Sequence, residues 1–306
     1  MSALVLLVVL VFSFATPSLG FELRMSIDAH LHVWSDGAAP FSYVRGAVPP
    51  DALQATSSPK ALMEEMSKAG TRGALIVQPI NHLFDHSFVE SAIQSHPSVF
   101  KGMCLLDPST EDEGYLRNLK EKGFGSVRFN PYLPEWNGAK MDSEAGLKFY
   151  KQCGELNMPV GFMCFKGLNN HIDEIKALLK ASPKTKCIID HWGFFVQEGK
   201  VVEESWSNLM GLAKYERVYV KISAPFRNVV DKEERTYMEL KGRLRELVDT
   251  FGAARVLWGT DFPFVMLEED NAYVKSVQRV RGWGLTEEEV AQVMSKTAES
   301  LLGKWG

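Results

Sequence analysis

The feature that most constrains the fold is an alternation of short apolar, β-rich segments with longer segments of helical period. Continuous apolar segments are typical of strands covered on both faces, and helices between them imply parallel pairing. We expect eight strands, beginning at residues 26, 71, 100, 124, 159, 186, 218 and 256. Eight such units are the number in a (β/α)8 barrel, so we predict a single barrel domain over residues 26–303. A doubly wound open sheet is the alternative, but no glycine-rich nucleotide loop supports it.

Each segment between the strands has one apolar face. In residues 59–70, for example, Leu62, Met66 and Ala69 share a face, and Gly70 ends the predicted helix. Similar segments cover residues 87–95, 113–122, 144–157, 172–181, 206–215 and 239–251, and a last helix is expected over residues 286–302. The longest irregular stretch, residues 35–58, follows the first strand, where barrel loops usually cover the active site.

Composition narrows the class of partner. The 306 residues carry a net charge of −4, and no run of Lys or Arg accumulates, so neither a nucleic acid nor an anionic membrane surface is indicated. A small-molecule substrate is therefore expected. The four cysteines show no C-x-x-C spacing, and we expect buried free thiols. The oligomeric state stays open, a homo-oligomer included.

The first 20 residues contain an apolar run that is too short to span a bilayer and ends in small residues. This pattern predicts a signal or targeting peptide and hence a secreted or organellar protein. The positive n-region is missing, however, and a shorter cytoplasmic product could begin at Met25. Both localisations stay open.

Polar side chains follow or end the predicted strands. In a (β/α)8 barrel, catalytic residues lie at the carboxyl ends of the strands. In "DAHLHVW", His30 and His32 share one face of a strand, because successive side chains alternate. The other strand-end residues are Asp107, Arg128, Asn130, His191, Ser223 and Asp261. Apolar strands that end in such groups must hydrogen-bond them or use them.

Two imidazoles and a carboxylate, from His30, His32 and Asp261, suit a divalent ion such as zinc or manganese. The alternative is a structural polar cluster that holds no metal. His191 lies two strands before Asp261, so it is expected across the mouth, as a general acid or base or as an oxyanion donor. Its neighbour Asp190 is expected to point the other way.

Further residues are candidates for binding the substrate. Arg128 is expected to bind a carboxylate through its planar fork, or else to neutralise Asp107 on the adjacent strand. Arg227 and Lys166 are candidate anion contacts. Aromatic walls are expected from Trp34, Tyr132 and Trp192. The histidines around the second helix, His82, His86 and His96, are expected to be solvated or to cap it.

The ordered set "DAHLHVW", "VRFN", "DHWG", "VKIS" and "GTDFPF" resembles the amidohydrolase superfamily, in particular its amidohydrolase-related branch of lactonases and decarboxylases. The resemblance runs from about residue 26 to 300. It implies a (β/α)8 barrel, and it places His30, His32, His191 and Asp261 at the family's catalytic positions.

One departure bears on the metal. Metal-binding members carry a histidine at the end of the fifth strand, where this chain has Met163, and a thioether is a poor ligand for such ions. His171 and Lys166 follow and could fold inward. In the same branch, the 2-pyrone-4,6-dicarboxylate lactonase type works without a metal, so the resemblance is compatible with one divalent ion or with none.

The expected function is hydrolysis of a small carboxylated or sugar-like lactone, or of a related ester or amide, by activated water. A metal-dependent non-oxidative decarboxylase is the alternative among enzymes. If the protein is not an enzyme, the alternative is a catalytically silent barrel that binds a metabolite.

Overall fold

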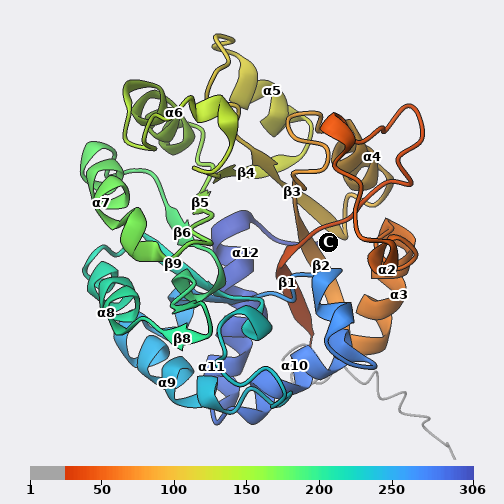
Figure 1. Cartoon of the computed structure of the whole chain (residues 1–306), viewed down its shortest axis with the longest axis vertical. Coiled ribbons are helices and arrows are strands. Elements are labelled where there is room, and N and C mark those ends of the chain that lie inside the picture. Colours follow the sequence, from red (N-terminus) through yellow and green to blue (C-terminus); the bar gives the residue numbers. More distant parts are fainter. Residues whose placement is uncertain (1–24) are drawn as a thin grey trace, which may run out of the picture.

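Eight parallel strands form the inner wall of the computed structural model, which describes residues 25–306 (Figure 1). The strands pair in the order β1-β2-β3-β4-β5-β6-β9-β10. Their bounds are β1 (Ser26–Leu31), β2 (Thr71–Val77), β3 (Phe100–Leu105), β4 (Phe124–Phe129), β5 (Val160–Phe162), β6 (Cys187–Ile189), β9 (Val218–Ile222) and β10 (Val256–Trp258). A parallel bridge between Leu31 and Phe262 joins the last strand to the first. The (β/α)8 barrel is confirmed, and the open sheet is excluded. The predicted targeting peptide, residues 1–20, lies outside the described residues.

The helices are α2 (Asp51–Gln54), α3 (Pro59–Ala69), α4 (Ser87–Ser95), α5 (Tyr115–Glu121), α6 (Glu144–Glu155), α7 (Ile172–Ala181), α8 (Glu203–Gly211), α9 (Glu239–Phe251), α10 (Ala272–Gly282), α11 (Glu287–Ala291) and α12 (Thr297–Leu302). They surround the strands on the outside of the barrel, except α12, which appears in the middle of the view (Figure 1). Their ends follow the sequence: Ser58 caps α3 through the Ala61 N–H, and Gly70 ends it at φ +70°. None of the helices described within residues 25–306 is both long and apolar enough to cross a membrane.

Three elements were not anticipated. Helix α2 lies within residues 35–58, which were expected to be irregular. Helix α10 follows Asn271, which has a left-handed backbone and makes no side-chain cap bond, so the sequence carries no start signal there. A two-stranded hairpin, β7 (Val196–Gln197) with β8 (Lys200–Val201), follows β6 and is too short to show an alternating pattern. The last helix begins at a capping box of Thr286 and Glu289, as expected, but a π-helical turn divides it into α11 and α12.

The apolar core lies mainly between the strands and the surrounding helices. A second, smaller cluster lies between strand residues such as Ile27, Val77 and Leu257 and the C-terminal segment, which contributes Leu301 and Trp305. All four cysteines are buried and free, as predicted. Apolar side chains therefore pack the barrel from both sides.

Candidate active site

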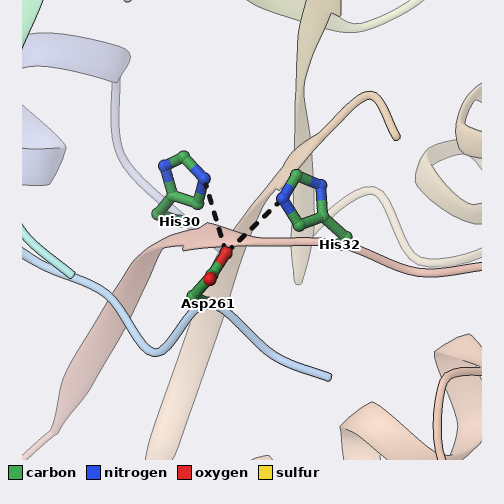
Figure 2. Close-up of side chains that lie close together, drawn as sticks. All are labelled: His30, His32 and Asp261. Atoms are coloured by element: carbon green, nitrogen blue, oxygen red, sulfur yellow. Dashed lines mark ion pairs between the residues drawn. The ribbon is translucent and has the colours of Figure 1, made fainter. Parts of the chain in front are cut away.

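Four predicted residues meet at the carboxyl ends of β1, β6 and β10. The Oδ1 atom of Asp261 lies 3.5 Å from Nε2 of His32, 3.9 Å from Nε2 of His30 and 4.0 Å from Nε2 of His191. Figure 2 shows both β1 imidazoles directed toward the same carboxylate oxygen. All four side chains are buried. The strand-end pattern thus leads to one cluster of three imidazoles around one carboxylate.

Asp28, which was not singled out from the sequence, connects the backbone segments that carry His30 and Asp261. Its carboxylate accepts hydrogen bonds from the backbone N–H of His30 at 3.1 Å, and from the backbone N–H and hydroxyl of Thr260. The Asp261 N–H in turn donates to the His30 carbonyl at 2.8 Å. Asp28 thus ties β1 to the turn that carries Asp261, which itself adopts a left-handed backbone with φ +62°.

The residue after β6 contradicts the sequence prediction. Asp190 was expected to point away from His191, but its carboxylate lies 3.0 Å from Nε of Arg128 and 3.4 Å from Nδ1 of His30. The alternation of a strand ends here, because His191 and Trp192 both have positive φ values. Arg128 therefore pairs with Asp190 and not with Asp107, which accepts instead from Ser109 outside the cluster.

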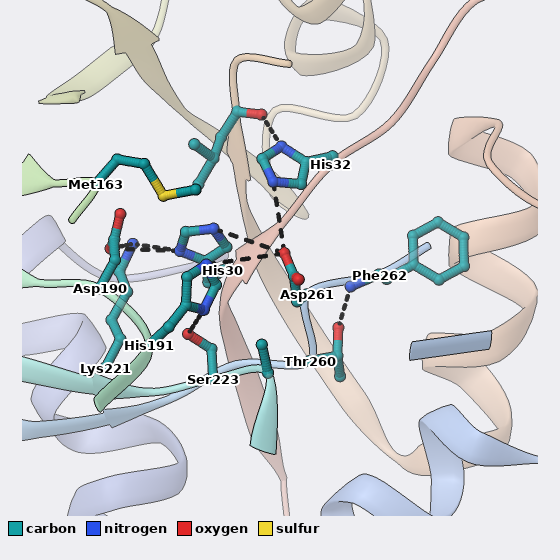
Figure 3. Close-up of polar contacts among 12 residues, drawn as sticks. His30, His32, Met163, Asp190, His191, Lys221, Ser223, Thr260, Asp261 and Phe262 are labelled. Atoms are coloured by element: carbon teal, nitrogen blue, oxygen red, sulfur yellow. Dashed lines mark hydrogen bonds and ion pairs between the residues drawn. The ribbon is translucent and has the colours of Figure 1, made fainter. Parts of the chain in front are cut away.

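Lys221 on β9 is a member of this buried network that sequence reasoning missed. Its ammonium lies 3.4 Å from Oδ1 of Asp190 and 3.2 Å from Nδ1 of His30, with no exposed surface. A lysine inside an otherwise apolar strand was the available signal. Figure 3 shows Lys221 and Asp190 side by side behind His30, on the opposite side from Asp261.

Burial and charge set the protonation states of the cluster. Burial works to raise the pKa of Asp261, but His191, His32 and Arg227 outweigh it and hold that pKa well below its usual value. Burial lowers the pKa of His191 to about 4. Burial and the nearby Lys221 charge hold the pKa of His30 well below its usual range. At neutral pH the site thus contains an ionised Asp261 beside neutral His30 and His191.

A cavity of about 220 Å³ opens above the cluster. Of the predicted substrate-binding residues, Trp34, Arg128 and Arg227 line it, together with Met163, Asn130 and Phe264. The guanidinium of Arg227 donates to Oδ2 of Asp261 at 3.1 Å and lies 5.0 Å from the ring centroid of Phe264. The cavity therefore offers two guanidinium groups and a carboxylate among aromatic walls.

Other predicted residues lie outside the lining. Tyr132 stacks behind Phe165 with ring centroids 4.2 Å apart, and its hydroxyl accepts from the Lys166 N–H. His171 bonds the same hydroxyl at 3.0 Å and so does not turn toward Met163. Trp192 is buried against Trp283, and Ser223 bonds Nδ1 of His191. The structure therefore does not bring Tyr132, Lys166 or Trp192 into the cavity.

Two of the three histidines near the second predicted helix differ from the prediction, whereas His96 is at the C-cap position of α4. His82 and His86 are buried, and His86 accepts a hydrogen bond from the Leu105 N–H instead of facing solvent. His86 precedes α4 but makes no side-chain cap bond there.

Three side chains of the cluster could serve as ligands of a divalent ion. Ligand atoms of His30, His32 and Asp261 lie within 4.8 Å of one another, and His32 donates from Nδ1 to the Val77 carbonyl, as zinc-binding histidines do. Three fixed cations, Arg128, Lys221 and Arg227, already face the two carboxylates of Asp190 and Asp261. Asp28 is a third carboxylate beside the cluster, so the three cations are already balanced, and a divalent ion would add two positive charges that none of these carboxylates offsets. The thioether of Met163 accepts from Arg128 instead of completing a ligand set. The residues thus fit a metal poorly.

Comparison with known proteins agrees with this architecture. The family model described as amidohydrolase matches residues 27–304. A 4-sulfomuconolactone hydrolase of Rhizobium radiobacter is 28% identical over 244 residues, covering 77% of this chain and 75% of that protein. A 2-pyrone-4,6-dicarboxylate hydrolase of Comamonas testosteroni is 27% identical over 252 residues, covering 80% and 78%.

The fold is also found among solved structures. The structure of a proposed 2-pyrone-4,6-dicarboxylic acid hydrolase of Pseudomonas putida superposes with a TM-score of 0.77 at 22% identity, covering 92% of this chain and 98% of that one. Because the family model spans nearly the whole described barrel, the chain belongs to the amidohydrolase family.

Proposed function

We propose that this protein hydrolyses a small lactone that carries at least one carboxylate, with Asp261 as general base. The observation that carries the proposal is the ionised Asp261 in the wall of the cavity, with three imidazoles and the Arg227 guanidinium around it and Arg128 in the same cavity lining. The hydrolase relatives named above, which the chain matches over three quarters of its length, support the same reaction class.

In the proposed reaction, Asp261 accepts a proton from a water molecule, and the hydroxide oxygen forms a bond to the lactone carbonyl carbon. The carbonyl oxygen becomes an oxyanion. His30 and His191, whose Nε2 atoms lie 3.9 and 4.0 Å from Oδ1 of Asp261, are the proposed groups that stabilise it. The ring C–O bond then breaks, and the leaving oxygen takes the proton from Asp261. Lactone and water thus give one hydroxy acid. Such general-base catalysis contributes about 10²–10⁴-fold to the rate.

The two arginines support the choice of a carboxylated substrate. Arg128 donates from Nε to Asp190 and from Nη2 to Met163, and Arg227 donates from Nε to Asp261. Each guanidinium therefore has further terminal N–H groups for a ligand in the cavity. Guanidinium groups bind carboxylates through paired hydrogen bonds. We expect one of them to hold the substrate carboxylate while the lactone carbonyl lies over Asp261.

We propose, further, that hydrolysis needs no metal ion, because the fixed cations and Met163 make the donor set a poor one. A non-oxidative decarboxylase needs a firmly held ion and is disfavoured for the same reason. The catalytically silent barrel remains as an outcome of the test below.

The test compares wild type with Asp261→Asn on a panel of carboxylated lactones and aromatic acids, with ring opening and CO2 release followed separately. Asp107→Asn is the matched control, because Asp107 also follows a strand but lies outside the cluster. We expect ring opening by the wild type and the control, a loss of about 10³-fold in Asp261→Asn, and no loss on treatment with a chelator. CO2 release would establish the decarboxylase, and ligand-induced thermal stabilisation without turnover would establish the silent barrel.

A further inference from the structure

The buried Lys221 has no role in the proposed reaction and needs an explanation of its own. It stands on β9 with no exposed surface, and burying a charged ammonium costs several kcal/mol unless partners compensate. Its Nζ atom meets Oδ1 of Asp190 at 3.4 Å and Nδ1 of His30 at 3.2 Å, and the weak acceptor Sδ of Met103 at 3.9 Å. Lys221 therefore connects the buried ion pair to the catalytic histidine.

The direction of the hydrogen bond between Lys221 and His30 follows from what each group can do. A lysine ammonium has three donors and no acceptor, so the His30 Nδ1 atom must be the acceptor. The carboxylate of Asp190 also lies near Nδ1, at 3.4 Å, but it is already neutralised by Lys221 and by Arg128. A proton on Nδ1 would face the ammonium at 3.2 Å and remove one of its acceptors.

We infer that Lys221 is a positioning residue that holds neutral His30 in the tautomer with its proton on Nε2, an inference that rests on the function proposed above. Nε2 of His30 is buried, has no hydrogen-bond partner in the described protein and faces Asp261 (Figure 3). An unpartnered N–H directed into the site is a donor for the oxygen that gains charge during the reaction.

The two histidines of the β1 pair then hold opposite tautomers. His32 donates from Nδ1 to the Val77 carbonyl at 2.8 Å, so in the neutral ring the lone pair is on Nε2, 3.5 Å from Oδ1 of Asp261. A water between His32 and Asp261 would find two acceptors for its protons, while His30 offers a donor to the carbonyl oxygen. A metal ion requires lone pairs directed at it from both imidazoles. A proton on Nε2 of His30 removes one of these lone pairs, so this tautomer favours a water molecule over a metal ion.

The inference is tested first in the unaltered protein. With ¹⁵N-labelled histidine, NMR correlation spectra report which ring nitrogen carries the proton, and His30→Asn and His32→Asn variants assign the two signals. We expect a proton on Nε2 of His30 and on Nδ1 of His32. A proton on Nδ1 of His30 would overturn the inference, whether or not any lactone is hydrolysed, so its failure is separate from that of the proposed function.

The second test removes the donor with Lys221→Met, which keeps the length of the side chain. His30 is then free to donate from Nδ1 to Asp190, which turns a lone pair at Nε2 toward the cavity. We expect zinc affinity, measured by competition with a chelating dye, to rise at least about 10-fold. We expect kcat to fall about 10²-fold with little change in KM, because the lost bond forms with the oxyanion.

Lys101→Met is the control, because Lys101 is a partly buried strand lysine that contacts Trp305 and the Leu302 carbonyl, away from the site. If Lys221→Met does not fold, the double variant with Asp190→Asn removes both charges together, leaves Nδ1 with an amide oxygen to bond, and is predicted to show the same tautomer change. A folded variant with an unchanged His30 tautomer and unchanged zinc affinity would assign Lys221 a structural role only.

Discussion

Substituting Gly259 by Ala tests whether close contact between β10 and β1 positions the carboxylate of Asp261, the proposed general base. A Cβ at this position would lie 2.8 Å from both the backbone N and the Cβ of His30, and 3.2 Å from its Cα. Contacts below 3.0 Å are not tolerated, and here the obstacle is mostly backbone. That backbone is held by the Asp28 carboxylate and by the Asp261 N–H, so it has no free direction in which to move.

Forcing an extra methyl group into such a contact costs about 1–3 kcal/mol. For a domain of this size each kcal/mol lowers Tm by roughly 2–4 °C, so we expect a fall of several degrees. Gly259 precedes Asp261 by two residues, and a displacement of about 1 Å between catalytic groups costs on the order of 10²-fold in rate. The expected result is therefore a modest loss of stability with a much larger loss of kcat.

The measurements are thermal unfolding and steady-state hydrolysis on the same preparations. Gly242→Ala is the matched control, because Gly242 lies inside α9 and an added Cβ meets nothing within 4 Å. Alanine there should stabilise the protein by about 0.5–1 kcal/mol and leave kcat unchanged. Wild-type Tm and kcat in Gly259→Ala would refute the reasoning, since the two strands would then have room between them.

The remaining predictions concern charge. Arg128→Met leaves buried Asp190 with Lys221 as its remaining cation and should lower the unfolding free energy by about 3–5 kcal/mol. Arg227→Met should instead raise KM for a carboxylated substrate and leave Tm unchanged within error, because the Arg227 side chain is 38% exposed. Urea unfolding and steady-state kinetics on both variants distinguish the two roles. Equal losses of stability in the two variants would contradict the prediction. Burial lowers the pKa of His86 to about 4, so the unfolded chain binds more protons between pH 4 and 6.5. The stability that neutral His86 provides is complete above pH 6.5 and falls by about 2 kcal/mol at pH 5. His86→Gln keeps an acceptor for the Leu105 N–H but cannot be protonated. Its unfolding free energy should therefore fall less between pH 7 and 5 than that of the wild type. If the unfolding free energies of the two proteins fell in parallel, His86 would be solvated.

The barrel was predictable because each of its units carries a local signal. Gly70 ends α3 and the acidic first turn after Thr286 begins α11, and both depend only on neighbouring residues. Helix α10 has no such signal at Asn271 and was missed. The pairing of His30 and His32 with Asp261 followed from strand order, because the last strand of a closed barrel lies beside the first.

Strand periodicity predicted the wrong side-chain direction at positions where the chain leaves a strand. Asp190 was assigned to the wrong face because the alternation was continued past Ile189, although His191 and Trp192 turn the chain with positive φ. Tyr132 and Lys166 were expected in the cavity for a related reason. They lie in loops, where their direction depends on partners such as Phe165 and His171 that no local pattern specifies.

Lys221 shows how far such reasoning from sequence can be extended. A charged residue inside a strand that is covered on both faces cannot reach water, so its counter-charge must lie on another strand at the same level of the barrel. Among the described residues, the acids near that level are Asp28 on β1 and Asp190 directly after β6, because Asp261 follows its strand by several residues and Asp107 lies outside the cluster. A charge-balance rule would therefore have predicted the Lys221–Asp190 pair and placed Asp190 inside the barrel. Once the pair is placed, the contact of Lys221 with His30 follows from their shared depth, and with it the His30 tautomer that we propose.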